Sequence, residues 1–494
     1  MREQYPEWPP RVVVRSAVIV DILRALPASL AARVTRRGAI AAIIAIAALG
    51  AFALRIWDIQ DRFWMLEDQI RDWEIVLQPF WRLPLVGPPT HVHGYTIGPA
   101  FYWILWSIRV TIGPFFENLP HAGGIGQAAL QTAADTLLMV AVWRRTRLPW
   151  VAAAMFVVVV TSSFDLALAG LVWNPTMGST LAKMATALVL LNWHRGSLVR
   201  LGVTAAVAWS SVHAYTGAVF VALCVLLALV VDTWQHAGRG AAVRALAVVA
   251  ATVAALQIPY LVHQISRHFG DPAMSAVSGG IAEILSGRAA PLWGQSIRGY
   301  RDAVHSNEVA PWTFAHLGWA LIAGGAIVAW RFRRDPPLLI MILLPQIGAM
   351  VGFAFFLGPP DSYYYLSLMP AAVLTILLPI AAIPWPRARH AVGLAVLLAA
   401  IVTIPSRVQL STTICRLPEY RILVAASRTL RNLHQPLRAI VTDFPLPPTC
   451  NPGFLYFVLG GTIDRSSPWV AVISANGQIH YINNDINKAR RGGA

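Results

Sequence analysis

The chain has 494 residues, of which 56% are hydrophobic and 13% are charged. Soluble proteins carry about 25% charged residues, so this composition excludes a soluble globular protein and indicates a polytopic membrane protein. The net charge of +16 does not indicate nucleic-acid binding, because the basic residues lie scattered between apolar runs and form no patch.

The chain begins with a basic leader, residues 1–38, ahead of the first long apolar run. Arginines concentrate in cytoplasmic loops, so the leader predicts a cytoplasmic N-terminus. The basic region is too long for a cleaved signal peptide. Residues 39–57 are therefore predicted to form an uncleaved first transmembrane helix.

Further apolar runs follow along the chain. Because a transmembrane helix needs about 20 mostly apolar residues, the sequence predicts about eleven such helices, several of them short. They cover residues 39–57, 124–143, 149–163, 177–193, 201–213, 217–231, 244–262, 311–330, 336–356, 365–383 and 390–404. The expected fold class is an all-α polytopic membrane protein, with a transmembrane domain over residues 39–404.

The loops alternate in charge if residues 58–123 form a first outer loop that carries the catalytic residues. Within it, residues 99–116 are aromatic but interrupted by Arg109, Gly113 and Pro114, which predicts a segment lying along the outer surface. Residues 263–310 form a second large outer loop. We expect outer juxtamembrane helices in these loops.

Residues 405–494 are more polar and contain strand-like stretches such as 469–473. They predict a small α/β domain on the extracytoplasmic side. In that compartment Cys415 and Cys450 could form a disulfide. The Ala- and Arg-rich composition is typical of a bacterium, which indicates the bacterial cytoplasmic (inner) membrane.

Charge is concentrated at one point of the first outer loop, the run Glu67-Asp68-Gln69-Ile70-Arg71-Asp72. If the run is helical, Asp68, Arg71 and Asp72 share a face. Neighbouring carboxylates raise each other's pKa and an arginine lowers it, which suits a base that works near neutral pH. An ordinary solvated helix with internal ion pairs remains the alternative.

A Gly-Pro-Pro turn and two alternating histidines, His91 and His93, follow in the same loop, with Tyr95 close behind. Substrate hydrogen bonding is favoured over metal binding, because the two histidines have neither a third nor a fourth ligand nearby. The sequence therefore predicts no metal site and no cofactor, and leaves a divalent-metal requirement open.

This arrangement resembles the GT-C superfamily, and is more closely similar to the branch of the protein O-mannosyltransferases and the lipid A aminoarabinose transferases. The resemblance covers roughly the membrane region. It rests on a cytoplasmic N-terminus, a long first outer loop with an Asp68-Gln69-x-Arg71-Asp72 run, a Gly87-Pro88-Pro89 turn, and Gly98-Pro99-Ala100-Phe101-Tyr102-Trp103.

The resemblance implies transfer of a sugar from a polyprenyl-phosphate donor to a glycan, lipid or protein acceptor on the extracytoplasmic face. In that family an early acidic residue of the first outer loop is the catalytic base. Asp68 matches it best, and Glu67 and Asp72 are the alternatives. One base opposite the leaving phosphate predicts inversion at the anomeric carbon, with Arg71 helping to bind the phosphate.

The resemblance also implies substrate-binding roles further along the chain, for Asn174, His213 and the run Tyr363-Tyr364-Tyr365, which would lie near the lipid phosphate. Asn174 could instead cap a helix, and the tyrosines could form an interfacial belt. Lys183 lies within an apolar run, where a cation costs about 3 kcal/mol. It is expected to snorkel, to pair with an acid or to meet a phosphate.

Two other functions remain open. An O-antigen ligase or polymerase would use basic residues of a late outer loop, and residues 263–310 contain Arg298 and Arg301. A lipid-linked sugar transporter or flippase would show an inverted repeat and polar breaks near the membrane midplane. Neither of these two features is evident in the sequence.

Overall fold

The computed structural model describes residues 36–57, 59, 67–90, 94–306, 314–355, 361–414, 420–434, 436–446 and 451–483. The chain divides into two compact units, Met1–Gly50 and Ala51–Ala494. Cys415 and Cys450 lie outside the described residues, and so does most of the basic leader. The disulfide therefore stays a prediction.

The described part of the first unit is the beginning of α3 (Arg36–Ile56). Its sequence is a nearly unbroken run of alanine and isoleucine, and Ile43, Ile46 and Leu49 are each about two-thirds exposed. A helix that is apolar on all sides suits a lipid environment. α3 therefore has the character expected of the first transmembrane helix.

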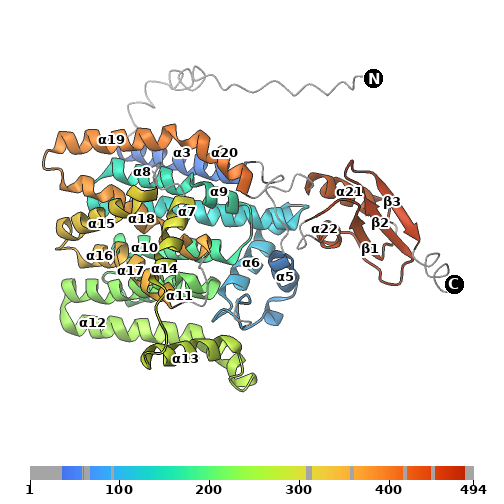
Figure 1. Cartoon of the computed structure of the whole chain (residues 1–494), viewed down its shortest axis with the longest axis horizontal. Helices are drawn as coiled ribbons and strands as arrows, with labels where there is room; N and C mark the ends of the chain where they lie inside the picture. Colours follow the sequence, from blue (N-terminus) through green and yellow to red (C-terminus); the bar gives the residue numbers. More distant parts are fainter. Residues whose placement is uncertain are drawn as a thin grey trace, which may run out of the picture. The chain divides into compact units, whose positions relative to one another are not determined.

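The second unit is mostly helical (Figure 1). From the end of α3 to residue 266 its helices are α5 (Glu67–Val76), η1 (Phe80–Arg82), α6 (Ala100–Thr111), η2 (Gly113–Phe115), α7 (Leu119–Thr146), α8 (Pro149–Val160), α9 (Ser163–Ala169), α10 (Asn174–Leu190), α11 (Leu198–Ala214), η3 (Thr216–Ala218) and α12 (Val219–Ser266).

The following helices are α13 (Pro272–Leu285), α14 (Trp293–Ser306), α15 (Phe314–Arg331), α16 (Pro336–Ile342), α17 (Leu344–Ala354), η4 (Ser362–Leu368), α18 (Met369–Leu377), η5 (Leu378–Ala382), α19 (Pro386–Val402) and α20 (Ile404–Ile414). Many begin with proline in the first turn, where its missing N–H is not needed.

Six helices within the described residues are long and apolar enough to cross a membrane. The bent pair α8 and α9, with 56° between its halves, brings the number to seven if it counts as one span. The expected number of eleven is not confirmed. α10 and α11, with 17 residues each, occupy two of the other expected segments and lie at the short end of the length range of a span.

The centre of the second unit is α10, which packs against α7 and α11. α11 in turn packs against α12, whose 48 residues are interrupted at Gly238 by φ 79° and ψ 179°. That conformation is accessible to glycine and costly for other residues. One glycine therefore divides α12 into the two segments that we expected as separate spans.

Residues after α20 form a small mixed domain, with α21 (Tyr420–Asn432) and α22 (Pro452–Val458) beside a three-stranded sheet (Figure 1). The strands are β1 (Ala439–Thr442), β2 (Trp469–Ile473) and β3 (Ile479–Asn483). β2 lies in the middle, parallel to β1 and antiparallel to β3.

Buried apolar residues of the sheet and of α21 form the core of this domain. Ile440 and Ala471 are paired across the sheet and both are buried. On α21, Leu423, Ala426 and Leu430 recur at helical spacing and are also buried. The predicted α/β character of the C-terminal region is confirmed.

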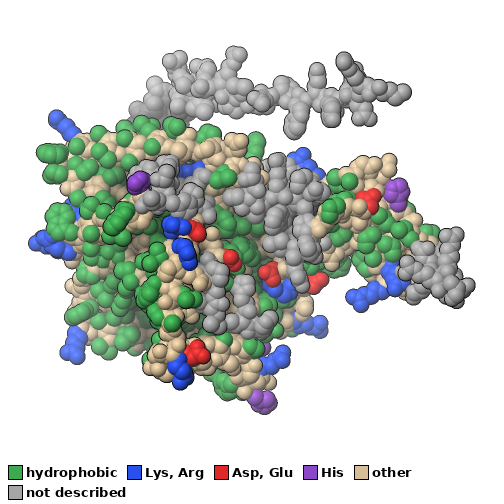
Figure 2. Space-filling model, in the orientation of Figure 1, with side chains coloured by type: hydrophobic (Ala, Val, Ile, Leu, Met, Phe, Trp, Pro, Cys, Tyr) green, Lys and Arg blue, Asp and Glu red, His purple; other side chains and the backbone are tan. Residues whose placement is uncertain are grey.

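The surface agrees with a multi-pass membrane protein. Figure 2 shows hydrophobic side chains over most of the visible face of the helical region, with basic side chains mainly towards its edges. Large apolar residues such as Trp319, Ile322 and Trp330 are 60–72% exposed. Soluble monomers rarely expose so much contiguous apolar surface.

Candidate functional site

The predicted acidic helix exists as α5 (Glu67–Val76). Ile70, Trp73 and Val76 form its buried face, and a Cβ at Gly123 would lie 2.3 Å from the Trp73 ring, so the indole needs a glycine beneath it. At the C-terminal end, Arg109 of α6 donates a hydrogen bond to the Val76 carbonyl. These contacts fix the helix in place.

Three side chains of α5 form a charged triad: Asp68, Arg71 and Asp72. Arg71 donates to Asp68 Oδ1 over 2.6 Å from Nη1, and to Asp72 Oδ1 over 3.0 and 2.9 Å from Nε and Nη2. The guanidinium is thereby held between two carboxylates. The side chain of Glu67, the third acid of the run, lies outside the described part of the chain.

The two carboxylates of the triad differ in environment. The Asp68 side chain is 57% exposed, whereas that of Asp72 is 1% exposed. The hydroxyl of Tyr102 donates to Asp72 Oδ1 over 3.0 Å, and Asp72 Oδ2 is buried without a hydrogen-bond partner in the described structure. Asp68 is thus accessible to a substrate, and Asp72 is enclosed by protein.

Burial dominates the protonation of Asp72. It raises the pKa of this carboxyl to about 6, although Arg71 and the Tyr102 hydroxyl oppose the shift. Burial alone would lower the pKa of Arg71, but the adjacent Asp72 carboxylate outweighs that effect and raises it. Arg71 therefore stays charged, and Asp72 can change its protonation state in mildly acidic conditions.

The loop after α5 turns back on itself. Thr96 N donates to the Pro88 carbonyl over 2.9 Å, and Thr90 N donates to the Gly94 carbonyl over 2.7 Å. His91 and His93 at the tip lie outside the described residues, so their predicted roles stay predictions. Tyr95 is 36% exposed, and its ring lies 5.7 Å from that of His263.

His213 lies beneath this loop. It is 1% exposed, and a Cβ at Gly98 would lie 2.2 Å from its Nδ1, so the backbone of Gly98 passes directly over the imidazole. Nδ1 is buried and without a hydrogen-bond partner among the described residues. This position identifies His213 as a support of the loop; a substrate role for it stays a prediction.

The three late tyrosines have different surroundings. Tyr365 is fully buried, donates to the Ser296 carbonyl over 3.2 Å and packs 4.9 Å from Phe353, as a core residue does. Tyr363 is half-buried and Tyr364 is 9% exposed, and their rings stack with centroids 4.7 Å apart.

Tyr363 and Tyr364 join two aromatic residues that we did not predict, Trp173 and Tyr215. The Trp173 and Tyr363 rings lie 4.9 Å apart, and Tyr215 lies 6.3 Å from Tyr363 and 6.1 Å from Tyr364. We call these four residues the aromatic wall. Asn174, beside Trp173, is the first residue of α10, and Trp173 occupies the N-cap position.

Among solved structures, that of ArnT from Cupriavidus metallidurans bound to undecaprenyl phosphate is similar over 87% of this chain and 86% of that one, with 14% identity and a TM-score of 0.51. The chain has the GT-C fold. No family model and no curated protein matches the sequence.

The oligosaccharyltransferase of Archaeoglobus fulgidus tethered with an acceptor peptide is also similar, with 13% identity and a TM-score of 0.48. The similarity covers 84% of this chain and 62% of that one, so the chain spans less than two thirds of its length.

Within the GT-C transmembrane region lies a second charged group, the intramembrane quartet of Arg55, Asp135, Asp165 and Lys183. Arg55 Nη2 lies 2.5 Å from Asp135 Oδ2 and 2.8 Å from Asp165 Oδ2. Lys183 Nζ lies 2.9 Å from Asp135 Oδ1. Lys183 therefore pairs with acids, one of the three outcomes that the sequence left open.

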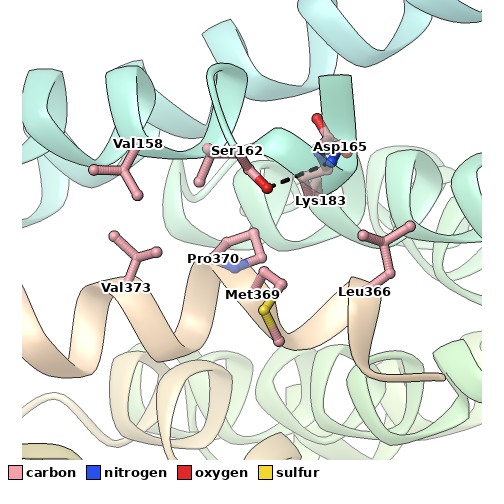
Figure 3. A pocket seen from close by; sticks show the side chains of 9 residues that line it. Val158, Ser162, Asp165, Lys183, Leu366, Met369, Pro370 and Val373 are labelled. Carbon is pink, nitrogen blue, oxygen red and sulfur yellow. Dashed lines mark hydrogen bonds and ion pairs between the residues drawn. The ribbon is translucent and has the colours of Figure 1, made fainter. Parts of the chain in front are cut away.

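A small cavity adjoins the quartet. Ser162, Asp165 and Lys183 line one side of it, and Met369 and Pro370 lie opposite (Figure 3). Its volume is about 10 Å³, close to what one water molecule needs. A sugar or a phosphate does not fit, so we assign the quartet a structural role.

The sequence contained a partial signal for this quartet. Lys183 is an unusual cation in an apolar run, but its partner Asp135 lies in another apolar run and Asp165 lies two residues after a third, and nothing local connects the three. A search for opposite charges in separate apolar segments would have found them, because unpaired charges in a membrane are costly.

The remaining candidates are dispersed. Within residues 263–310, Arg267, Arg288 and Arg298 are exposed, and Arg301 forms a surface pair with Asp302 at 3.2 Å. Over the described part of the chain, no three His, Cys, Asp or Glu side chains are grouped as metal ligands would be.

Proposed function

We propose that this protein is a glycosyltransferase that moves a sugar from a polyprenyl-phosphate donor to an acceptor hydroxyl at the extracytoplasmic side of the membrane. The observation that carries the proposal is the charged triad, in which Arg71 is held between an exposed and a buried carboxylate. The GT-C fold and the ArnT structure with undecaprenyl phosphate support the donor class.

Asp68 is the catalytic base in this proposal. Its carboxylate is exposed at the start of α5, and only its Oδ1 accepts from Arg71. The acceptor oxygen attacks the anomeric carbon, the bond from that carbon to the phosphate oxygen breaks, and the acceptor proton passes to Asp68. The phosphate leaves with the bonding electrons, so no strong general acid is needed, and the product is inverted.

Asp72 acts through Arg71 and is a positioning residue. It accepts two hydrogen bonds from the guanidinium and one from Tyr102, which together fix the direction in which Arg71 Nη1 points. A fixed guanidinium can stabilise negative charge on the leaving phosphate without reorganising. Asp72 itself is too enclosed to touch an acceptor.

The test is transfer of radiolabelled sugar from a panel of undecaprenyl-phosphate sugars by purified protein in nanodiscs. We expect Asp68→Asn to lower the transfer rate about 100-fold or more, the usual contribution of a general base. Glu74→Gln is the matched control, because Glu74 is an exposed acid on the same helix outside the triad. Full transfer by folded Asp68→Asn protein would overturn the assignment.

A further inference from the structure

We propose that the aromatic wall, formed by Trp173, Tyr215, Tyr363 and Tyr364, is a carbohydrate subsite that stacks on the sugar ring of the donor. This inference rests on the proposed function and assigns the wall to the uncharged sugar. The family resemblance had placed the tyrosine run near the lipid phosphate.

The wall is assembled from three separate segments of the chain. Trp173 stands immediately before α10, Tyr215 follows α11, and Tyr363 and Tyr364 belong to η4. Their rings approach within 4.7 to 6.3 Å of one another. Aromatic faces gathered in this way offer a broad, rigid surface with a polar edge at each tyrosine hydroxyl.

The wall has an exposed part and a buried part. Trp173 and Tyr363 are half-buried and keep accessible ring surface, while Tyr215 and Tyr364 are each 9% exposed behind them. A Cβ at Gly178 would lie 2.6 Å from the Tyr215 Cβ, so the backbone of α10 holds this residue tightly. Tyr215 is therefore held in place before any ligand arrives.

One polar atom of the wall lacks a partner. The hydroxyl of Tyr215 is buried and makes no hydrogen bond within the described structure. A buried unsatisfied hydroxyl costs free energy and calls for an explanation. A sugar hydroxyl can both donate and accept, so it would satisfy this group once a ring in front of it shifts.

The charge around the wall favours a neutral ligand. Asp361 occupies the N-cap position of η4 and places a negative charge two residues before Tyr363. A phosphate placed here would be repelled by Asp361, whereas a sugar ring can stack on the aromatic faces.

A packing contact connects the chain segments that carry the wall and the charged triad. Trp73 follows Asp72 on α5, and Val172 precedes Trp173. A Cβ at Gly123 would lie 2.3 Å from the Trp73 ring and 2.6 Å from a Val172 methyl group, so these two side chains meet above Gly123. This contact therefore joins a residue adjacent to Asp72 of the triad to a residue adjacent to Trp173 of the wall.

The experiment compares lipids with and without a sugar. Binding of undecaprenyl phosphate, undecaprenyl phosphate mannose and undecaprenyl phosphate glucose to the protein in nanodiscs would be measured without glycoside detergents, whose sugar heads would compete. We expect Trp173→Ala and Tyr363→Ala each to lower the affinity for the better-bound sugar lipid about tenfold. Their affinity for undecaprenyl phosphate should stay within twofold of wild type.

Tyr363→Phe distinguishes ring stacking from phosphate binding by the hydroxyl, and we expect it to bind the sugar lipid within twofold of wild type. Trp319→Ala is the control for loss of an exposed tryptophan, since Trp319 is 72% exposed. An equal loss of affinity for all three lipids in the alanine variants would overturn the sugar assignment alone. So would a loss of affinity in Tyr363→Phe equal to that in Tyr363→Ala. A wild-type protein that binds none of them would overturn the proposed function as well.

Discussion

The charged triad of α5 and the intramembrane quartet both place arginine between two aspartates, yet they leave different charges available. In the triad, Asp68 is 57% exposed and the group carries one net negative charge. In the quartet, the four side chains are at most 5% exposed and their charges cancel.

The comparison shows how burial decides whether a charged side chain stabilises the fold or can take part in chemistry. A buried pair gains little net stability, because desolvation offsets attraction, but removal of one partner leaves an uncompensated charge. The quartet therefore fixes helices relative to one another. The triad keeps one carboxylate in contact with solvent, where it can exchange a proton with a substrate.

The largest expected effect tests the quartet. Asp135→Asn leaves Arg55 and Lys183 to share Asp165, and we expect it to lower the free energy of unfolding by about 3–5 kcal/mol. Thermal unfolding of the purified protein would measure the loss. The double variant Asp135→Asn with Lys183→Met restores neutrality and should recover most of the stability. Additive losses in the double variant would contradict the role of charge balance.

A second prediction concerns the pH dependence of the triad. Above a pH of about 6 Asp72 is ionised and holds Arg71, while below it the carboxyl is protonated and the hold weakens. We therefore expect the transfer rate to fall as the pH drops through about 6. Asp72→Asn should transfer slowly at all pH values and lose this limb of the profile. An unchanged limb in that variant would assign the titration to another group.

Tyr102→Phe should have a smaller effect on the pH–rate profile: the acid limb shifts and is not lost. The Tyr102 hydrogen bond opposes the rise in the pKa of Asp72, so its removal should move the acid limb to higher pH. A hydrogen bond to a charged group contributes about 1.5–3 kcal/mol, and we expect a several-fold lower rate at pH 7. The pH–rate profile measures both effects, and a limb shifted to lower pH would contradict the assigned contact.

The smallest effect is expected at an exposed pair. Glu117 contacts Arg431 at 2.6 Å and Arg428 at 3.0 Å, and its side chain is 40% exposed. Exposed pairs contribute about 1 kcal/mol or less and are screened by salt. Glu117→Gln should lower the melting temperature slightly at low ionic strength and leave it unchanged in 0.5 M salt. A large fall in the melting temperature at both ionic strengths would show that this exposed pair contributes as much to stability as a buried one.

Much of the fold could be predicted from hydropathy, because long apolar runs and their breaks report directly on helices. The first span, the two halves of α12 and the strand at residues 469–473 were each predicted as separate segments. The number of complete spans was not confirmed, since helices such as α10 and α11, with 17 residues each, lie at the short limit of a span. Helix length depends on breaks such as that after Leu190, and composition alone does not locate them.

The site was predicted in part. The run around Asp68 was visible because charge is rare in this chain, and its helical spacing correctly brought Asp68, Arg71 and Asp72 together. The different burial of the two aspartates was not visible, because Tyr102 and the packing around Trp73 cause it. Tyr215 was not predicted as a site residue, because its contact with Tyr363 exists only in the folded chain.

The quartet also has a consequence for the order of events during synthesis. Arg55 is made 80 residues before Asp135 and 110 before Asp165. At about 5–20 residues per second, the ribosome needs roughly 4–16 s to supply the first partner. For that time the end of α3 carries a cation whose neutralising aspartates do not yet exist. Because an arginine at the end of a helix can snorkel to the interface, pairing of α3 with α7 is a step that follows the insertion of α3, and its earliest time is set by the spacing of residues in the chain.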